Sequence, residues 1–341
     1  MHEPAFWYRP SSGISLLLSP LAAIYGAVAA RRMQRKGFDA GVPVFCVGNY
    51  HVGGAGKTPT VLALVKLLRD LGETPVVLSR GYGGRLRGPI MVQSDRHTAA
   101  EVGDEPLMLA RTVPVAVARE RLDGLALAKS QGASVILMDD GFQNPAIAKD
   151  ASVIVIDAHR GLGNACVFPA GPLRAPLPPQ IDRTDALIVI GEGDAARAVA
   201  ATIAAQNKPV LAAQIKPDEA ALASLRGRRV LAFAGIGDPD RFFRTLRGNG
   251  IEVATQRAFD DHHPFTHDEI EALLTEARRD ALIPVTTEKD LARIGAAGAP
   301  PSWAQGIVAF PVTLEFDSAP DLRRFVADRL FRARDSRLRN G

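Results

Sequence analysis

A glycine-rich loop near the N-terminus constrains the fold more than any other feature of this sequence. Residues 42–47 form a short apolar run typical of a buried strand, and residues 60–71 carry apolar side chains at helical spacing. Between them lies the segment Val52-Gly53-Gly54-Ala55-Gly56-Lys57-Thr58. Glycines let backbone N–H groups turn toward a phosphate, and the start of a helix favours an anion through its dipole. The strand, loop and helix together predict a phosphate-binding loop in an α/β domain.

The residues that end this loop have the chemistry that a nucleoside triphosphate needs. Lys57 can reach the β- and γ-phosphates, and the hydroxyl of Thr58 can bind Mg²⁺. His51 stands where the usual pattern has its first glycine, so the match to that pattern is incomplete. A glycine-rich turn without a ligand does not account for a lysine and a threonine at the start of a helix. We therefore predict that ATP binds at Val52, Gly53, Gly54, Ala55, Gly56, Lys57, Thr58 and Pro59.

Two consecutive aspartates follow another apolar run and favour a metal site beside this loop. Residues 135–138 are apolar and lead directly into Asp139 and Asp140. A strand that ends in carboxylates is typical of the element that holds Mg²⁺ in P-loop enzymes. Aspartates at strand ends also commonly do no more than begin a loop. Together with the glycine-rich loop, the pattern predicts that Thr58, Asp139 and Asp140 hold Mg²⁺.

The remaining sequence alternates apolar runs with helical stretches, which indicates a mostly parallel sheet covered on both faces. Further strands are predicted at 75–78, 113–118, 153–156 and 186–190, and a second series, with a strand at 283–286, begins near residue 229. The Gly- and Pro-rich residues 159–183 are expected to hold little regular structure. With a boundary near 205–225, we predict a membrane-associating N-terminal helix with its basic flank (1–36), a P-loop NTPase-like mostly parallel α/β domain (37–215), and a second, smaller α/β domain with a basic C-terminal helix (216–341).

The N-terminal segment is apolar enough to meet a membrane. Residues 11–30 contain no charged side chain, and four basic residues lie within 31–36. A secretory signal carries its positive charges before the apolar segment, so this order excludes one. The length suits a span of ~20 residues, but serines, glycines and a proline dilute it. We favour a helix in the membrane surface, between the aromatic residues 6–8 and the basic cluster, over a core helix or a true span.

Other polar clusters in the sequence are candidates for binding or activating the molecule that accepts the phosphoryl group. Asp104 is either a proton acceptor or, as is common for aspartate before a helix, an N-cap. His262 and His263 follow two aspartates, a pattern that suits a metal site or ordinary loop structure. Arg80 follows a predicted strand, where α/β sheets place their binding loops, and could meet a phosphate.

Several of these segments occur together in a known family. In order along the chain they are Val47-Gly48-Asn49, Gly53-Gly54-Ala55-Gly56-Lys57-Thr58-Pro59, Leu78-Ser79-Arg80-Gly81-Tyr82-Gly83, Val102-Gly103-Asp104-Glu105-Pro106, Asp139-Asp140-Gly141-Phe142-Gln143, Phe168-Pro169-Ala170-Gly171-Pro172-Leu173-Arg174, Phe233-Ala234-Gly235-Ile236-Gly237, Asp261-His262 and Thr286-Thr287-Glu288-Lys289-Asp290. Their order and spacing resemble the tetraacyldisaccharide 4′-kinases of lipid A biosynthesis. The resemblance covers nearly the whole chain and extends to His51, because the loop of this family lacks the first glycine.

The resemblance implies a function and a set of site residues. It implies phosphoryl transfer from ATP to the 4′-hydroxyl of a tetraacylated glucosamine disaccharide 1-phosphate. It places the enzyme on the cytoplasmic face of the bacterial inner membrane, peripheral or anchored by its N-terminal helix. Asp104 is then the catalytic base, paired with His262 from the second domain. Contacts with acceptor or phosphate are implied for Asn49, Arg80, Tyr82, Arg121, Gln143 and Arg174. One departure is Ala175, which stands where the family usually has glutamate.

Composition and the remaining motifs leave few alternatives. The net charge of +4 is small for 341 residues, and we read the arginines near the C-terminus as a solvated helix face, so binding to nucleic acid is not predicted. Cys46 and Cys166 lie far apart, which favours no disulfide framework and no cysteine metal site. A P-loop GTPase or metallochaperone-type ATPase is an alternative, although the sequence has no Asn-Lys-x-Asp motif. A membrane-tethered ATP-binding module without enzymatic activity is another.

Overall fold

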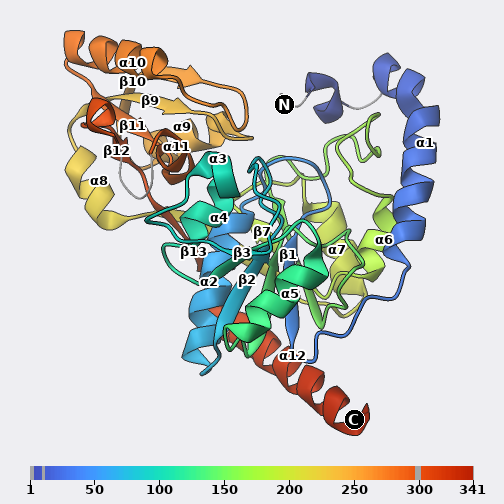
Figure 1. Ribbon diagram of the computed structural model, residues 1–341. Helices are drawn as coiled ribbons and strands as arrows, with labels where there is room; N and C mark the ends of the chain where they lie inside the picture. Colours follow the sequence, from blue (N-terminus) through green and yellow to red (C-terminus); the bar gives the residue numbers. More distant parts are fainter. Residues whose placement is uncertain (1–3, 10–11, 296–300, 341) are drawn as a thin grey trace.

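The computed structural model describes residues 4–9, 12–295 and 301–340, and it contains two sheets (Figure 1). The larger sheet has nine strands, in the spatial order β13 (Val312–Phe316), β8 (Val210–Pro217), β7 (Ala186–Ile190), β6 (Ala151–Asp157), β1 (Val44–Gly48), β5 (Val135–Asp139), β2 (Pro75–Ser79), β4 (Val115–Val117) and β3 (Ile90–Met91). The strands from β8 to β4 run parallel, and the edge strands β13 and β3 are antiparallel to their neighbours. The predicted P-loop NTPase-like, mostly parallel sheet is confirmed.

Helices cover both faces of this sheet and bury its central strands. One face carries α2 (Lys57–Asp70), α4 (Asp104–Leu109) and α12 (Ala319–Asn340), and the other carries α5 (Arg121–Ser130) and α7 (Arg197–Ala205). β1, β5 and β6 are buried along their whole length, which explains why their sequences are continuous apolar runs. Because parallel strands end at one edge of a sheet, the residues that follow these three strands lie close together.

A smaller unit contains the second sheet. Its four parallel strands have the order β10 (Glu252–Ala258), β9 (Arg229–Ala234), β11 (Ile283–Thr286) and β12 (Val308–Ala309), and its helices are α8 (Glu219–Leu225), α9 (Pro239–Gly248), α10 (His267–Arg279) and α11 (Glu288–Ile294). It has hydrophobic clusters of its own on the two sides of its sheet, around Phe243 and Phe310 and around Phe233 and Ile270. The unit lies over α3 (Ala99–Val102) and α4 of the larger domain (Figure 1).

The C-terminal part of the chain returns to the larger domain, which differs from the prediction that all of 216–341 forms the smaller one. β13 pairs antiparallel with β8, and Leu322, Val326 and Leu330 of α12 pack into the core of the larger domain. Sequence alone did not show this return because the alternation of strands and helices continues without a break. The predicted solvated face of α12 also differs in part. Some of its arginines pair with carboxylates of the larger domain: Arg329 with Asp185, Arg334 with Glu73 and Arg337 with Asp150.

The N-terminal helix α1 (Gly13–Met33) lies along the outside of the larger domain (Figure 1). Small residues, Ser15, Ala22 and Gly26, form its buried edge. Most of its large apolar side chains are exposed: Ile14, Leu16, Leu17, Leu21, Ile24 and Val28. Among the described residues, α1 is the one helix that is long and apolar enough to cross a membrane. Its exposure excludes the core-helix alternative and is compatible with association with a membrane.

The Gly- and Pro-rich segment 159–183 joins this helix to the sheet. It is largely irregular, as predicted, although it also contains the short helix α6 (Leu177–Asp182). Trp7, in the turn of 3₁₀ helix η1 (Ala5–Tyr8), is buried against the segment and donates from Nε1 to the carbonyl oxygen of Pro169 at 3.1 Å. Asn164 donates from its amide to the hydroxyl of Ser15 in α1 at 3.0 Å. The N-terminal elements are therefore docked on this segment.

Candidate active site

The loop between β1 and α2 has the geometry of a phosphate-binding loop. Gly53 and Gly56 have φ angles of 102° and 92°, in the left-handed region that favours glycine. Gly56 is the N-cap of α2, and the buried residues Lys57 and Thr58 begin the helix. The side-chain amide of Asn49 donates to the carbonyl oxygen of Gly53 at 3.0 Å and ties the loop to the end of β1. The backbone of the loop and the start of the helix are thus arranged to bind an anion.

His51, in the place of the usual first glycine, fastens this loop to the rest of the domain. Its ring is buried, and Nδ1 donates to the carbonyl oxygen of Val52 at 2.8 Å. Burial lowers the pKa of His51 to about 4, so the ring is neutral at pH 7. His51 forms a β-bridge with Leu173, and the N–H of Val52 donates to the carbonyl oxygen of Pro172 at 2.9 Å. The segment after β6 therefore supports the loop from the side.

Asp140, the residue that directly follows β5, contacts two cations of the site. Arg174 donates from Nη1 to its Oδ1, and Nζ of Lys57 lies 3.9 Å from its Oδ2. Burial raises the pKa of the Asp140 carboxyl, but the charges of Lys57 and Arg174 outweigh this effect and hold the pKa well below its usual range. Asp140 is therefore ionised and links the loop lysine to Arg174.

Asp139, the last residue of β5, has a different environment. Its carboxylate is buried, and neither of its oxygens has a hydrogen-bond partner among the residues that the structure describes. Burial, reinforced by the carboxylates of Glu105 and Asp140, raises the pKa of Asp139 to about 7. Asp139 lies beside Val47 of β1 in the sheet register, just before the loop begins. Buried carboxylate oxygens of this kind are costly unless a proton or a cation binds them.

Asp104 is the first residue of α4 rather than its N-cap, so the N-cap alternative is wrong. It is only 4% exposed. Its Oδ1 accepts from the N–H of Glu105 at 2.9 Å, and its Oδ2 accepts from Nδ1 of His262 at 3.2 Å, across 158 residues of sequence. Burial raises the pKa of the Asp104 carboxyl, but the hydrogen bond from His262 and the charges of Lys289 and Arg293 hold the pKa well below its usual range.

His262 lies in the loop that follows β10, in the smaller unit. Its φ of 60° is unusual for a residue other than glycine, and such strain is common at functional sites. The N–H of His262 donates to the carbonyl oxygen of Gly235 at 3.0 Å, which holds the backbone in place. The hydrogen bond with Asp104 raises the pKa of the imidazole. The exposed ring of Tyr82 stands edge-on to the imidazole, with 5.4 Å between ring centroids.

Two cations on α11 strengthen this contact between the units. Lys289 forms an ion pair with Glu105, and Arg293 donates from Nε to Oδ2 of Asp104 at 3.0 Å. Lys289 lies within one of the family segments but had no predicted role, and no sequence motif marks Arg293. The only sequence feature that could have predicted this role is the spacing of the two residues by one helical turn, and the same spacing is common on solvated helices.

On the other side of the loop, the smaller unit reaches the carboxyl end of β6. Arg241 of α9 pairs with Asp157, the last residue of β6, at 3.1 Å. A Cβ atom at Gly237 would lie 3.0 Å from the backbone nitrogen of Gly54, so the two units nearly touch at the loop. A cleft of about 580 Å³ opens next to this contact. Both units contribute charged or ionisable residues to its lining, among them His159, Arg160, Asp238, Arg244 and Asp261.

Residues 14–331 match the protein family described as tetraacyldisaccharide-1-P 4′-kinase. The chain belongs to this family. It is 68% identical over 339 residues to the tetraacyldisaccharide 4′-kinase of Bradyrhizobium diazoefficiens, with 99% of each chain covered. It is 67% identical over 334 residues to the enzyme of the same name from Rhodopseudomonas palustris, with 98% of each covered. The structure of an "apo" form of LpxK from Aquifex aeolicus in complex with ATP is 26% identical, with a TM-score of 0.71, and covers 93% of this chain and 99% of its own.

The family resemblance predicted from the motifs is confirmed, and the other residues that it implied fall into two groups. Arg80 and Tyr82 are exposed just after β2, and the ring of Tyr82 lies next to His262. Arg121 is buried behind the strand ends, with guanidinium nitrogens 3.5 Å from the carbonyl oxygens of Leu78, Asp139 and Asp140.

Gln143 and Asn49 are also directed inward. Gln143 donates from its amide to the carbonyl oxygen of Asn49 at 2.8 Å and to Oε1 of Gln180 at 2.9 Å. Ala175, where the family usually has glutamate, is buried, and its carbonyl oxygen accepts from Gln180 at 2.8 Å. The structure thus brings Gln143 and Asn49 to the base of the loop, where they hold backbone and side chains together.

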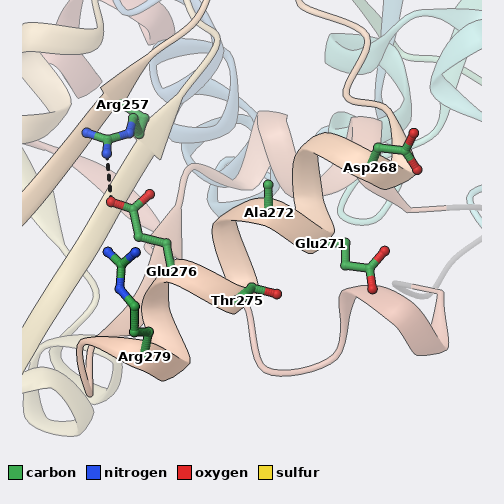
Figure 2. A pocket seen from close by; sticks show the side chains of 7 residues that line it. All are labelled: Arg257, Asp268, Glu271, Ala272, Thr275, Glu276 and Arg279. Carbon is green, nitrogen blue, oxygen red and sulfur yellow. Dashed lines mark hydrogen bonds and ion pairs between the residues drawn. The ribbon is translucent and has the colours of Figure 1, made fainter.

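A second hollow, of about 630 Å³, lies on the outer surface of the smaller unit, against α10 (Figure 2). Its lining contains none of the residues discussed above, and Arg257 pairs there with Glu276 across the hollow. His267, Asp268 and Glu271 gather on the same helix, but all three are exposed. Exposed acidic groups are common without a ligand, so we assign no role to this surface.

Proposed function

We propose that the chain transfers the γ-phosphoryl group of ATP to the 4′-hydroxyl of a tetraacyldisaccharide 1-phosphate in lipid A biosynthesis. The observation that carries this proposal is the contact of Asp104 with His262 beside a phosphate-binding loop. A nucleotide switch has no need of a buried carboxylate and histidine brought together from two units. Family membership, the names of the relatives and the ATP in the Aquifex aeolicus structure support the same function.

The reaction needs few groups beyond those that the site provides. The oxygen of the acceptor hydroxyl forms a bond to the γ-phosphorus, the bond from that phosphorus to the bridging oxygen of ADP breaks, and the hydroxyl proton passes to Asp104. The loop N–H groups and Lys57 bind the β- and γ-phosphates and stabilise the charge that develops on the oxygens. Arg174, held by Asp140, is placed to add positive charge on the same side.

The carboxyl end of β5 and the start of α2 have side chains that fit a magnesium ion. Asp139 is buried with two unpaired oxygens, counting the residues that the structure describes, and hard oxygen ligands are those that Mg²⁺ prefers. Thr58 is buried at the start of α2 and carries the hydroxyl that P-loop enzymes use for the same ion. We propose that Thr58 and Asp139 hold Mg²⁺ and that Asp140, engaged by Lys57 and Arg174, supports them. When bound, the ion neutralises charge on the phosphate oxygens of ATP.

The lipid acceptor and helix α1 both indicate that the protein works at the membrane surface. Each buried CH₂ of an acyl chain contributes ~0.8 kcal/mol to membrane binding, so a tetraacylated acceptor stays in the bilayer. Leu17 is 80% exposed on α1, within an apolar face that no described residue covers. Basic residues at 31–36 suit anionic headgroups at the end of this face. We propose that α1 lies in the cytoplasmic surface of the inner membrane, the side where ATP is available, and brings the site to the acceptor headgroup.

A product assay tests this function directly. The purified protein is incubated with [γ-³²P]ATP, MgCl₂ and the tetraacyldisaccharide 1-phosphate in mixed micelles, and the lipid fraction is analysed for a second phosphate. We expect label on the 4′-oxygen of the disaccharide, and no transfer to an acceptor that lacks the 4′-hydroxyl. ATP or GTP turnover that is unchanged by the acceptor, with no labelled lipid, would instead favour the nucleotide-switch alternative.

A further inference from the structure

Helix α11 of the smaller unit presents two cations to two consecutive carboxylates of the larger domain. Lys289 and Arg293 are spaced by one helical turn and face the same side. Lys289 pairs with Glu105, and Arg293 donates from Nε to Oδ2 of Asp104 at 3.0 Å. The side chain of Arg293 is 9% exposed, so its charge interacts with Asp104 in an environment with little water.

The guanidinium of Arg293 is oriented by its own unit. Its Nη1 donates to the carbonyl oxygen of Gly235 at 2.8 Å and to Oδ1 of Asp290 at 2.8 Å. Asp290 is itself fully buried, and its Oδ2 accepts from the N–H of Gly235 at 3.1 Å and the hydroxyl of Thr287 at 2.7 Å. These contacts fix the plane of the guanidinium, which leaves Nε directed at Asp104.

The hydrogen bonds of Asp104 show which oxygen is left for a substrate. An ionised carboxylate oxygen accepts about two hydrogen bonds. Oδ2 already accepts from Arg293 and His262, whereas Oδ1 accepts only from the N–H of Glu105 among the described residues. One acceptor position therefore stays open, and it is on Oδ1.

We propose that Arg293 is a positioning residue for the phosphoryl transfer, one that clamps Oδ2 of Asp104 so that Oδ1 receives the proton of the acceptor hydroxyl. The inference rests on the proposed function, in which Asp104 is the proton acceptor. Because Arg293 belongs to the smaller unit, the clamp forms only where the two units are in contact.

A clamp of this kind lowers the basicity of Asp104, and the reaction tolerates that loss. Phosphoryl transfer passes through a loose transition state, in which placing the hydroxyl in line with the phosphorus counts for more than removing its proton early. The charged or titratable groups that face Asp104 are Arg293, His262 and Lys289, which favour its ionised form, and the carboxylates of Glu105 and Asp290, which oppose it.

The test combines variants of Arg293 and Asp104 in the full chain, assayed with ATP, MgCl₂ and the disaccharide 1-phosphate in mixed micelles. We expect Arg293→Gln to lower kcat by about 10- to 100-fold while the KM for ATP changes less than about threefold. Arg293→Lys, which keeps the charge and can reach Asp104 with one donor, should restore kcat to within about fivefold of the wild type. Arg279→Gln, at an exposed ion pair in α10, is the matched control and should leave kcat unchanged.

The decisive comparison is with Asp104→Asn. A residue that acts through Asp104 has little left to contribute once that carboxylate is gone, so the double variant should be within about threefold of Asp104→Asn alone. In Arg293→Gln the acid limb of the pH profile of kcat should also move to higher pH, because the cation that favours ionised Asp104 is absent. If Arg293→Gln does not fold, Arg293→Lys is combined with Asp104→Asn and judged by the same rule.

Two outcomes overturn different parts of the account. Losses that multiply independently in the double variant, or an unchanged acid limb, mean that Arg293 only stabilises the smaller unit, and the inference fails while the proposed function stands. Near wild-type kcat in Asp104→Asn alone means that Asp104 is not the proton acceptor, and the proposed function fails at that residue whatever Arg293 does.

Discussion

The two halves of the candidate site are built in different ways. The nucleotide half comes from one domain and from short segments, because the loop, the helix start and the two aspartates follow two neighbouring strands. The acceptor half is built across two units: His262 hydrogen-bonds to Asp104, and Lys289 and Arg293 form ion pairs with Glu105 and Asp104. The first half is shaped mainly by the backbone of the larger domain. The second half exists only while the units are in contact, so catalysis can be coupled to closure over both substrates.

Apart from changes to Asp104 and His262, the largest effect should come from the nucleotide half. Lys57→Ala removes the ammonium that stabilises charge on the transferred phosphoryl group, so we expect kcat to fall by about 10³-fold with the fold intact. Thermal unfolding checks the fold, and the lipid product assay measures kcat. Lys66→Ala, an exposed position on the same helix, is the matched control and should behave as wild type. Near-normal turnover in folded Lys57→Ala would remove the basis for assigning the loop to ATP.

A smaller effect should come from helix α1, which we propose supplies the acceptor half with its lipid. Leu17→Glu places a charge in the exposed apolar face and removes about 1.5–3 kcal/mol of apolar burial in the membrane. We expect binding to anionic vesicles to weaken by at least about tenfold, while turnover of a soluble short-chain acceptor is unchanged. Vesicle co-sedimentation measures the first and the kinase assay the second.

The matched control for this change is Leu338→Glu, an exposed leucine on α12. It should leave binding to vesicles unchanged, because α12 docks on the larger domain and we assign it no membrane contact. Equal losses of vesicle binding in Leu17→Glu and Leu338→Glu would show that a general rise in negative charge, and not the face of α1, controls the interaction.

The smallest effect should be the pH dependence of the stability that the pairing of Asp104 with His262 adds to the fold. The hydrogen bond with Asp104 raises the folded-state pKa of His262 above its ordinary value of 6.5. A raised pKa means that the pairing stabilises the folded state fully below pH 6.5 and that this stabilisation is lost as the pH rises through the folded-state value. We expect the difference in free energy of unfolding between wild type and His262→Asn to be less than about 1 kcal/mol and to shrink from pH 6 to pH 9.

Urea unfolding of both proteins across this pH range measures the difference. A difference that grows with pH would contradict the sign of the raised pKa and would mean that the neutral imidazole is the form that binds Asp104 better. A difference that does not depend on pH would mean that the pairing is a neutral hydrogen bond.

The fold of the larger domain could largely be predicted from the sequence, because it depends on local patterns. Continuous apolar runs predicted the buried parallel strands, and the strand at Ala186–Ile190 was predicted with its observed bounds. The return of β13 and α12 could not be predicted, since pairing between β13 and β8 joins segments about a hundred residues apart and leaves no local mark. The docking of α1 by small residues could not be predicted for a similar reason, because serine and glycine were interpreted as dilution of an apolar segment and alanine as part of it.

The candidate site divides in the same way. The loop and the aspartates follow strands directly, so their spacing predicts where they lie. The contacts of Arg293 with Asp104 and of Lys289 with Glu105 depend on how the smaller unit packs on α4. No spacing in the sequence predicts that packing. Arg121 and Gln143 were expected to contact substrate or phosphate. In the structure both side chains donate to backbone carbonyl oxygens, of Asp139 and Asn49 respectively, and so hold the strand ends and the loop together. A polar residue in a family motif therefore does not by itself tell ligand contact from internal support.

The measurement that tests the central claim most directly is a double-mutant cycle on kcat/KM for Asp104→Ala and His262→Ala. The two residues lie in different units and meet at 3.2 Å, so the cycle reports whether the acceptor half works as one assembly. We expect each single variant to lose about 10²–10⁴-fold and the double variant to be within about threefold of the poorer single. Fully multiplicative losses would contradict the account, because they would show that His262 acts independently of Asp104 and that contact between the units does not build the acceptor half.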